Sequence, residues 1–124
     1  MMKVTSTDKA PAAIGPYSQA ISSGGFLFTS GQIPLDPASG EIVGADISAQ
    51  AEQVMKNIRA LLEANGIGYE KVIKATCFLA DMGDFAAFNK VYEKYFISKP
   101  ARSTVAVKQL PRNVLCEVET ISEL

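Results

Sequence analysis

The chain of 124 residues contains no histidine and no tryptophan. Histidine is the commonest general base and the commonest metal ligand in proteins. Its absence excludes a Ser-His-Asp or Cys-His mechanism within this chain. A zinc site would need four cysteine or carboxylate ligands, and the sequence does not cluster them, so we expect no metal and no cofactor. Proton transfer would have to use Glu, Asp, Tyr, Lys or water.

Cysteine is also scarce, because Cys77 and Cys116 are the only two. Their spacing matches no metal-binding or redox motif. Each lies in an apolar run typical of a strand, and free cysteine is among the most buried residue types. We therefore expect both thiols to be inert core groups.

The chain lacks an excess of charge and a long apolar run. Twelve Lys and Arg nearly balance thirteen Asp and Glu, without a basic cluster, which does not favour a nucleic-acid partner. No basic segment followed by an apolar run opens the chain, and no run approaches the roughly 20 residues of a membrane span. We expect a cytoplasmic protein without a membrane partner. The length and the 48% hydrophobic share predict one domain over residues 1–124.

Periodicity and turn signals predict an α+β order of elements. Asp46 or Ser48 can cap a first helix that runs through Asn65, and Asp84 can cap a second helix over residues 85–97. The predicted strands cover residues 3–5, 19–22, 26–30, 71–79, 102–109 and 114–121. A two-residue turn at Gly24-Gly25 joins the second and third strands, and Gly66 ends the first helix.

Each predicted helix carries one apolar stripe, which is aromatic in the second helix. Such stripes are typical of helices that pack on a core, so both helices should cover one face of a single sheet. The other sheet face also carries many apolar residues, and no third layer remains to cover it. A domain of this kind should bury that face against another copy of itself.

Two loops could present polar groups to a ligand. In Ile-Gly-Pro-Tyr-Ser-Gln, residues 14–19, Pro16 stiffens the loop that presents Tyr17. In Thr-Ser-Gly-Gln-Ile-Pro, residues 29–34, a strand ends at Gly31, where a ligand can approach the backbone closely. Taken alone, the first segment is also compatible with a packed loop that has no function. The second is also compatible with a simple strand-ending turn.

Arg102 and Glu117 form a third candidate site. Arginine suits carboxylate binding, because its planar fork donates two parallel hydrogen bonds, although a lone arginine is also an ordinary surface charge. A hairpin turn over residues 110–113 would place Ala106 opposite Glu117 and Arg102 opposite Ile121. Arg102 and Glu117 would then share a face about 13 Å apart, which leaves room for a small ligand or for groups from a neighbouring subunit.

Five short motifs, in order along nearly the whole chain, resemble the Rid (reactive intermediate deaminase) family, formerly called YjgF. They are Ala-Ile-Gly-Pro-Tyr-Ser-Gln from Ala13, Thr-Ser-Gly-Gln-Ile-Pro from Thr29, Asp84-Phe85 with Phe88-Asn89, Pro-Ala-Arg-Ser from Pro100, and Cys-Glu-Val-Glu from Cys116. The resemblance implies a chorismate-mutase-like fold, with a single mixed sheet and two helices on one face. It also implies a homotrimer with sites in the clefts between subunits.

The resemblance further implies a reaction and a set of site residues. The RidA branch hydrolyses 2-aminoacrylate, 2-iminopropanoate, 2-iminobutanoate and related acids, which pyridoxal-phosphate enzymes release, to 2-keto acids and ammonia. Arg102 would bind the substrate carboxylate and Glu117 would orient or activate the water. Tyr17 would be the third catalytic residue. Ser30, Gly31, Asn89 and Thr104 would bind substrate together with Arg102.

Two features depart from the family pattern. The linker between Phe96 and Pro100 is shorter than in many members, and Lys99 stands where an aromatic residue often precedes the Pro-Ala-Arg motif. Thr104 occupies a position often held by cysteine. These differences bear on substrate size and preference, and they leave Arg102 and Glu117 in place.

Three functions remain open from the sequence. An enamine or imine deaminase fits a site without histidine, because imine hydrolysis is already fast in water and positioning supplies much of the remaining gain. The alternative is a non-catalytic trimer that binds small molecules and regulates metabolism. A chaperone-like or ribonuclease module is a third reading, which the charge balance does not favour.

Overall fold

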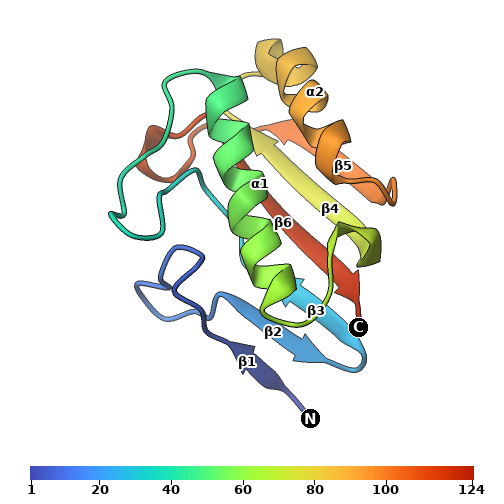
Figure 1. The fold of residues 1–124 in the computed structure, drawn as a ribbon. Helices are drawn as coiled ribbons and strands as arrows, with labels where there is room; N and C mark the ends of the chain where they lie inside the picture. Colours follow the sequence, from blue (N-terminus) through green and yellow to red (C-terminus); the bar gives the residue numbers. More distant parts are fainter.

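Six strands form one mixed sheet, and two α-helices lie side by side across one of its faces (Figure 1). The computed structural model describes residues 1–124. The strands follow the order β1-β2-β3-β6-β4-β5; β4 and β5 are parallel, and every other neighbouring pair is antiparallel. The elements are β1 Lys3–Thr5, β2 Ala20–Ser23, β3 Phe26–Thr29, α1 Ile47–Glu63, η1 Tyr69–Lys71, β4 Val72–Leu79, η2 Met82–Asp84, α2 Phe85–Tyr95, β5 Ala101–Ala106, η3 Pro111–Asn113 and β6 Cys116–Glu123. The predicted α+β class and the helices on one face are confirmed.

Helix α1 begins where the sequence predicts. The Asp46 side chain accepts a hydrogen bond of 2.9 Å from the backbone N–H of Ala49, which satisfies one of the free donors of the first turn. The helix ends at Glu63, two residues before the predicted end, and Gly66 follows with a φ of 74°. Its apolar stripe is buried against the sheet and comprises Ala51, Val54, Met55, Ile58, Leu61 and Leu62.

Helix α2 begins at Phe85 as predicted, but it differs from the prediction in its capping and in its last residue. Asp84 makes no side-chain cap; Asp81 instead accepts from the N–H of Gly83 and opens the short turn η2 that leads into α2. The helix ends at Tyr95, because Phe96 has left the helical region with φ −85° and ψ 64°. The predicted aromatic core is present: Phe88, Tyr92 and Phe96 are buried.

The last two strands do not form the predicted hairpin. Strand β5 ends at Ala106 and pairs only with β4, in parallel, because α2 crosses over between β4 and β5. Strand β6 instead enters the sheet between β3 and β4. Arg102 therefore lies opposite Ala75, and Glu117 lies opposite Phe78, so the predicted placement of Ala106 beside Glu117 is wrong.

No element of the chain covers the sheet face away from the helices (Figure 1). Paired residues of four adjacent strands form an apolar row across it: Val4, Ile21, Phe28 and Ile121. Val4 is 52% exposed and Phe28 is 43% exposed. A single chain thus leaves a sheet surface that self-association could bury.

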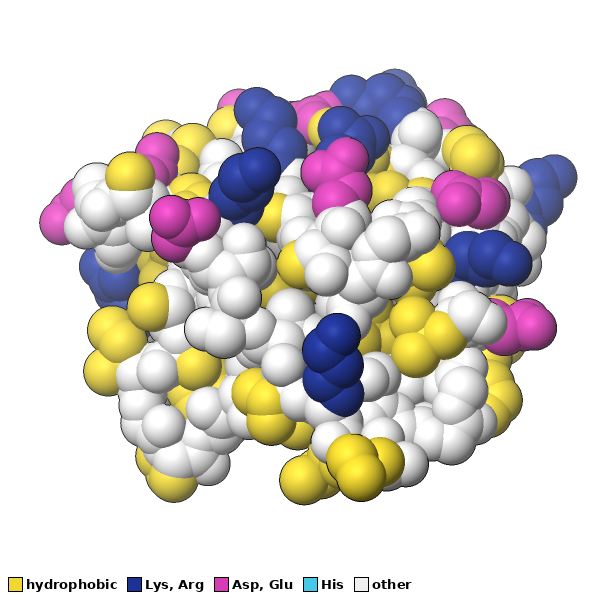
Figure 2. All heavy atoms as spheres, turned by 60° about the horizontal axis from the view of Figure 1, so that its bottom comes forward, with side chains coloured by type: hydrophobic (Ala, Val, Ile, Leu, Met, Phe, Trp, Pro, Cys, Tyr) yellow, Lys and Arg dark blue, Asp and Glu magenta, His cyan; other side chains and the backbone are white.

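The molecular surface carries mixed charge. Figure 2 shows Lys or Arg side chains interleaved with Asp and Glu along the upper part of one face, with no basic patch on it. Neither α-helix combines the length and the apolar character needed to cross a membrane. Both cysteines are free and buried in the core, as the sequence predicts.

Candidate functional site

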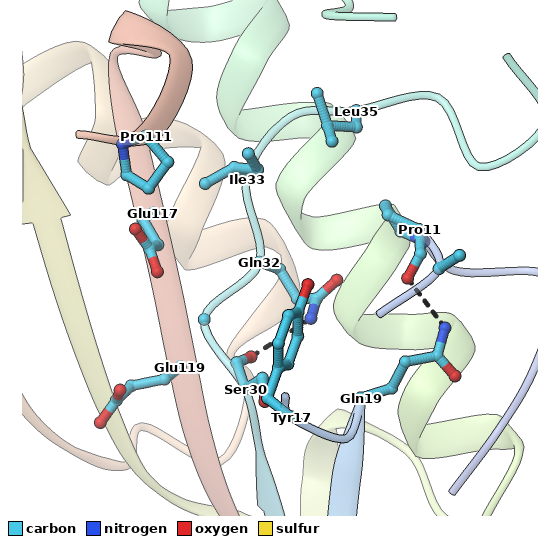
Figure 3. Close-up of a pocket in the computed structure, with 12 residues that line it drawn as sticks. Pro11, Tyr17, Gln19, Ser30, Gln32, Ile33, Leu35, Pro111, Glu117 and Glu119 are labelled. Atoms are coloured by element: carbon cyan, nitrogen blue, oxygen red, sulfur yellow. Dashed lines mark hydrogen bonds between the residues drawn. The ribbon is translucent and has the colours of Figure 1, made fainter. Parts of the chain in front are cut away.

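Four of the predicted site residues line one cavity of about 560 Å³: Tyr17, Ser30, Gly31 and Glu117. Figure 3 shows Glu117 projecting from β6 across the cavity from Tyr17 and Ser30, which lie on the loop before β2 and at the end of β3. The motifs from Ala13, from Thr29 and from Cys116 are therefore brought together. The remaining walls combine apolar and polar residues: Pro11, Ala12, Ile33, Leu35 and Pro111, with Gln19, Gln32 and Glu119.

A backbone bridge places Gly31 against Glu117. Beyond β3 the chain pairs once more with β6: Gln32 N–H donates to Val118 C=O at 2.8 Å, and Val118 N–H donates to Gln32 C=O at 3.1 Å. A Cβ added at Gly31 would lie 2.8 Å from Cδ of Glu117 and closer still to its Oε2. Because Gly31 has no side chain, the Glu117 carboxyl group can occupy this position.

Ser30 ties the Tyr17 loop to the end of β3. Its hydroxyl donates to Ser18 C=O at 2.6 Å, and its backbone N–H donates to Gln19 C=O at 2.9 Å. The Ser30 proton is committed to this bond, so toward a ligand its oxygen can act only as an acceptor. Tyr17 itself is 54% exposed, and its ring stands over the cavity (Figure 3).

Gln19 supports this cavity, a role that was not predicted from the sequence. Its side chain is buried, and its amide group donates to the backbone carbonyls of Thr7, Ala10 and Pro11. Its carbonyl oxygen accepts from the N–H of Thr7 at 2.8 Å. Gln19 thereby holds the N-terminal loop that carries Pro11 to the cavity wall. The sequence signal for this role was a polar residue at the first position of a predicted apolar strand.

Glu117 is half-buried and has no cationic partner in its own chain. Burial raises the pKa of its carboxyl group above that of an ordinary glutamate, and the neighbouring Glu119 charge adds to the rise. The one ion pair of the structure joins Lys94 to Glu52, away from this cavity. A carboxylate with a raised pKa, open to a cavity, suits proton acceptance from water. No three Asp, Glu or Cys side chains lie together as metal ligands would.

The other predicted residues gather elsewhere, at strand β5 and helix α2. Arg102 Nη1 donates to Asn89 Oδ1 at 2.6 Å, and its guanidinium lies 4.5 Å from the ring centroid of Tyr92. Asn89, Tyr92 and Arg102 share a cavity of about 630 Å³. Thr104 follows on the same face of β5, and its buried hydroxyl has no hydrogen-bond partner. Arg102 has no acidic partner either.

The open edge of β5 adds backbone donors to this group. Val107 N–H donates to Leu79 C=O, toward β4. Because N–H and C=O directions alternate along a strand, those of Arg102 and Thr104 face the free edge. An unpaired guanidinium beside free N–H groups is suited to bind a carboxylate.

The two groups of residues do not meet within one chain. Arg102 is opposite Ala75 and Glu117 is opposite Phe78, and residues three apart on β4 point to opposite faces of the sheet. Ala75 lies in the core under the helices, so Arg102 is on the helix side and Glu117 is on the uncovered side. The prediction that Arg102 and Glu117 share a face is wrong, because it assumed that their strands pair directly.

Comparisons with known proteins agree with this fold and these motifs. The sequence profile of the family described as Endoribonuclease L-PSP matches residues 7–124. A RutC family protein from Pyrococcus horikoshii is 55% identical over 123 residues, which cover 98% of each chain. The structure of YyfA from Yersinia pestis, described as a protein of unknown function of the conserved Rid family, has a TM-score of 0.97 and 44% identity, with full coverage of both chains. The structure of E. coli TdcF with bound serine has a TM-score of 0.93 and 42% identity, and 98% of each chain is covered.

These similarities define a class of small α+β protein with a mixed six-stranded sheet and two helices. The chain belongs to the Rid family, whose sequence profile carries the L-PSP description. The names of the relatives differ in the activity that they suggest, so the reaction has to be argued from the site.

Proposed function

We propose that the chain is an enamine/imine deaminase that acts as a homotrimer, with each site in a cleft between two subunits. The observation that carries the proposal is the separation of Arg102 from Glu117 on opposite faces of one sheet. Glu117 lies in a cavity without a cation, and Arg102 lies in a second cavity whose one acid, Glu93, forms no ion pair with it. Each group supplies what the other lacks, and contact between copies would join them.

The uncovered sheet face supports such an assembly. The apolar row from Val4 to Ile121 ends on β6, the strand that carries Glu117, so a neighbour packed there would approach that cavity. When the neighbour uses a different surface, such as its β5 edge, the contact is heterologous, and a threefold rotation between neighbours closes such contacts into a ring. A ring of three would hold three equivalent clefts.

The proposed reaction assigns a task to each side of the cleft. Arg102 and the free N–H of Thr104 bind the carboxylate of a 2-imino acid and fix its C2 carbon. Glu117 accepts a proton from water while the water oxygen bonds to C2 and the C=N bond becomes a single bond, and it then passes this proton to the nitrogen. The carbinolamine then collapses: Glu117 moves the hydroxyl proton to the nitrogen, the C=O bond forms, the C–N bond breaks, and ammonia leaves the 2-keto acid. Positioning and general base catalysis of this kind need no metal and no cofactor.

The other residues of the first cavity would complete the site. Tyr17 covers the bound imine, and the Ser30 oxygen accepts a hydrogen bond from its nitrogen. Gly31 leaves room for the Glu117 carboxylate. The apolar walls favour small aliphatic side chains, such as those of 2-iminopropanoate and 2-iminobutanoate. The serine bound in E. coli TdcF is a molecule of similar size with a carboxylate. We also propose a cytoplasmic location, beside the enzymes that release these intermediates.

Subunit complementation tests the proposal. Arg102→Ala and Glu117→Ala chains are each assayed with a threonine dehydratase that generates the intermediate, and are then unfolded and refolded together. In mixed trimers an intact cleft needs Glu117 from one chain and Arg102 from the next, so about a quarter of wild-type activity should return at equal mixing.

Three results would contradict parts of the proposal. No recovery, with mixed trimers verified by mass spectrometry, would exclude sites shared between subunits. A stable monomer would exclude the trimer. Binding of 2-oxobutanoate by the wild type without any acceleration would favour the non-catalytic regulator.

A further inference from the structure

The Arg102 guanidinium contacts three neutral side chains on one face of α2. Phe85, Asn89 and Tyr92 follow one another at i, i+4 and i+7 on α2, which places them on the same side of the helix. The Arg102 guanidinium carbon lies 4.5 Å from the ring centroid of Tyr92 and 5.4 Å from that of Phe85. Asn89 accepts one of its five N–H donors, and no acid accepts the others.

Two other aromatic rings pack against the Tyr92 ring. It stacks on Phe96 with centroids 4.1 Å apart and planes 15° apart, and Phe88 packs at 6.1 Å. The Tyr92 hydroxyl is buried without a hydrogen-bond partner. Burial raises the Tyr92 pKa to about 12, so the ring is neutral at physiological pH. The face of this neutral ring lies 4.5 Å from the guanidinium carbon of Arg102.

We propose that Tyr92 and Phe85 are positioning residues, whose ring faces orient the Arg102 guanidinium for a bidentate grip on a substrate carboxylate. Asn89 fixes the rotation of the guanidinium about its own axis through the Nη1 bond. This inference rests on the proposed function, in which Arg102 binds that carboxylate.

The neutrality of Phe85, Asn89 and Tyr92 has a chemical consequence for carboxylate binding. An arginine is commonly oriented by a carboxylate, but an acid at this place would compete with the substrate for the same two donors. Aromatic faces attract a guanidinium without accepting its in-plane N–H groups, so the fork stays free. The cation is thus oriented before the ligand arrives, which lowers the entropic cost of binding.

The test compares three tyrosine variants of the full chain, with 2-oxobutanoate as the probe in calorimetry and with steady-state kinetics in the dehydratase-coupled assay. Tyr92→Leu removes the ring and keeps an apolar side chain; its Kd and KM should rise about tenfold, with a much smaller change in kcat. Tyr92→Phe keeps the ring face and should restore both constants to within about twofold of wild type. Tyr95→Leu is the matched control, since Tyr95 lies on the same helix with its ring 5.0 Å from Arg59 instead, and it should leave both constants unchanged.

Unchanged affinity in folded Tyr92→Leu would overturn the inference, and so would a loss of affinity in Tyr92→Phe, because the hydroxyl would then be the active feature. If Tyr92→Leu does not fold, Phe85→Leu takes its place with a smaller increase expected, since Phe85 is only partly buried. Arg102→Lys separates the two levels of the argument. If it binds as well as wild type, the proposed function fails; if it loses affinity while the ring variants do not, only the positioning role fails.

Discussion

The carboxyl group of Glu117 occupies the space that a side chain at position 31 would fill. A Cβ built on Gly31 would lie 2.8 Å from Cδ and 3.1 Å from Cγ of Glu117. Distances of that size require one of the two to move. The Thr-Ser-Gly motif and the Cys-Glu-Val-Glu motif are therefore linked by packing, although 86 positions separate Gly31 from Glu117.

Gly31→Ala should reduce turnover by about tenfold or more, because the methyl group displaces the general base. The Glu117 side chain can rotate away, so the free energy of unfolding should change by only about 1 kcal/mol. Steady-state kinetics and thermal unfolding of the same preparation check both statements. Wild-type turnover would show that the Glu117 carboxylate is not needed where it now lies.

Glu117→Gln should separate activity from stability. Turnover should fall, while 2-oxobutanoate binding largely survives, because shape is kept and the base is lost. A raised carboxyl pKa means that the folded state binds the proton more tightly than the unfolded state. Its stabilising contribution is complete below the unfolded pKa and is lost as pH rises through the folded pKa. The variant should therefore melt higher than wild type at pH 7, and this difference should vanish in acid.

The pH profile of the wild type carries the same signature. If Glu117 acts as a base, its proton must leave before it can accept one, so kcat/KM should fall on the acidic side. Burial and Glu119 raise the pKa of Glu117 in the single chain, whereas Arg102 of a neighbouring copy would lower it, so the midpoint reports the balance of these effects. Glu119→Gln should move the midpoint down, since it removes the neighbouring negative charge. An unchanged midpoint would show that another group controls the acidic limb.

Arg102→Lys keeps the charge and loses the planar fork. Affinity for 2-oxobutanoate and deaminase activity should fall together by about tenfold or more, since a hydrogen bond to a charged group contributes about 1.5–3 kcal/mol. Sedimentation should show an unchanged oligomer. Lys108→Arg, on the exposed segment after β5, is the control for a general change of basic side chain.

The thiols of Cys77 and Cys116 should be unreactive in the native protein. Burial raises the pKa of Cys77 to about 11 and that of Cys116 to about 12, so both stay protonated at neutral pH. Iodoacetamide should label them only after unfolding. The double substitution to Ala should lower stability by about 1 kcal/mol per site and leave turnover intact. A folded but inactive double variant would contradict the assignment.

Local signals in the sequence predicted most of the elements. The Asp46 cap, the Gly24-Gly25 turn and the apolar stripe of α1 depend on residues close together in the chain, and the structure confirms each one. The aromatic stripe of α2 was also placed in the core correctly. Its second task, contact with Arg102 through Tyr92, could not be seen because it depends on the position of β5.

The pairing of the last strands could not be predicted in this way. The segment Leu110 to Asn113 has the composition of a hairpin turn, but Arg112 and Asn113 both adopt positive φ within a 3-10 turn. The partner of β5 is chosen by the parallel crossover through α2, and β6 is held by pairing with β3 and β4. These are contacts between distant parts of the chain, so a turn signal alone pointed to the wrong partner. The same error placed Arg102 and Glu117 on one face.

Opposed faces for Arg102 and Glu117 have a kinetic consequence. On the proposed assembly, a chain that has just finished folding holds halves of two different sites and a whole copy of neither. Refolding would then regain its secondary structure before any activity, and the lag between the two would shorten as chain concentration rises. Strong dilution would abolish activity without unfolding the protein. In the cell, the activity of each intact chain would therefore depend on the concentration of the protein.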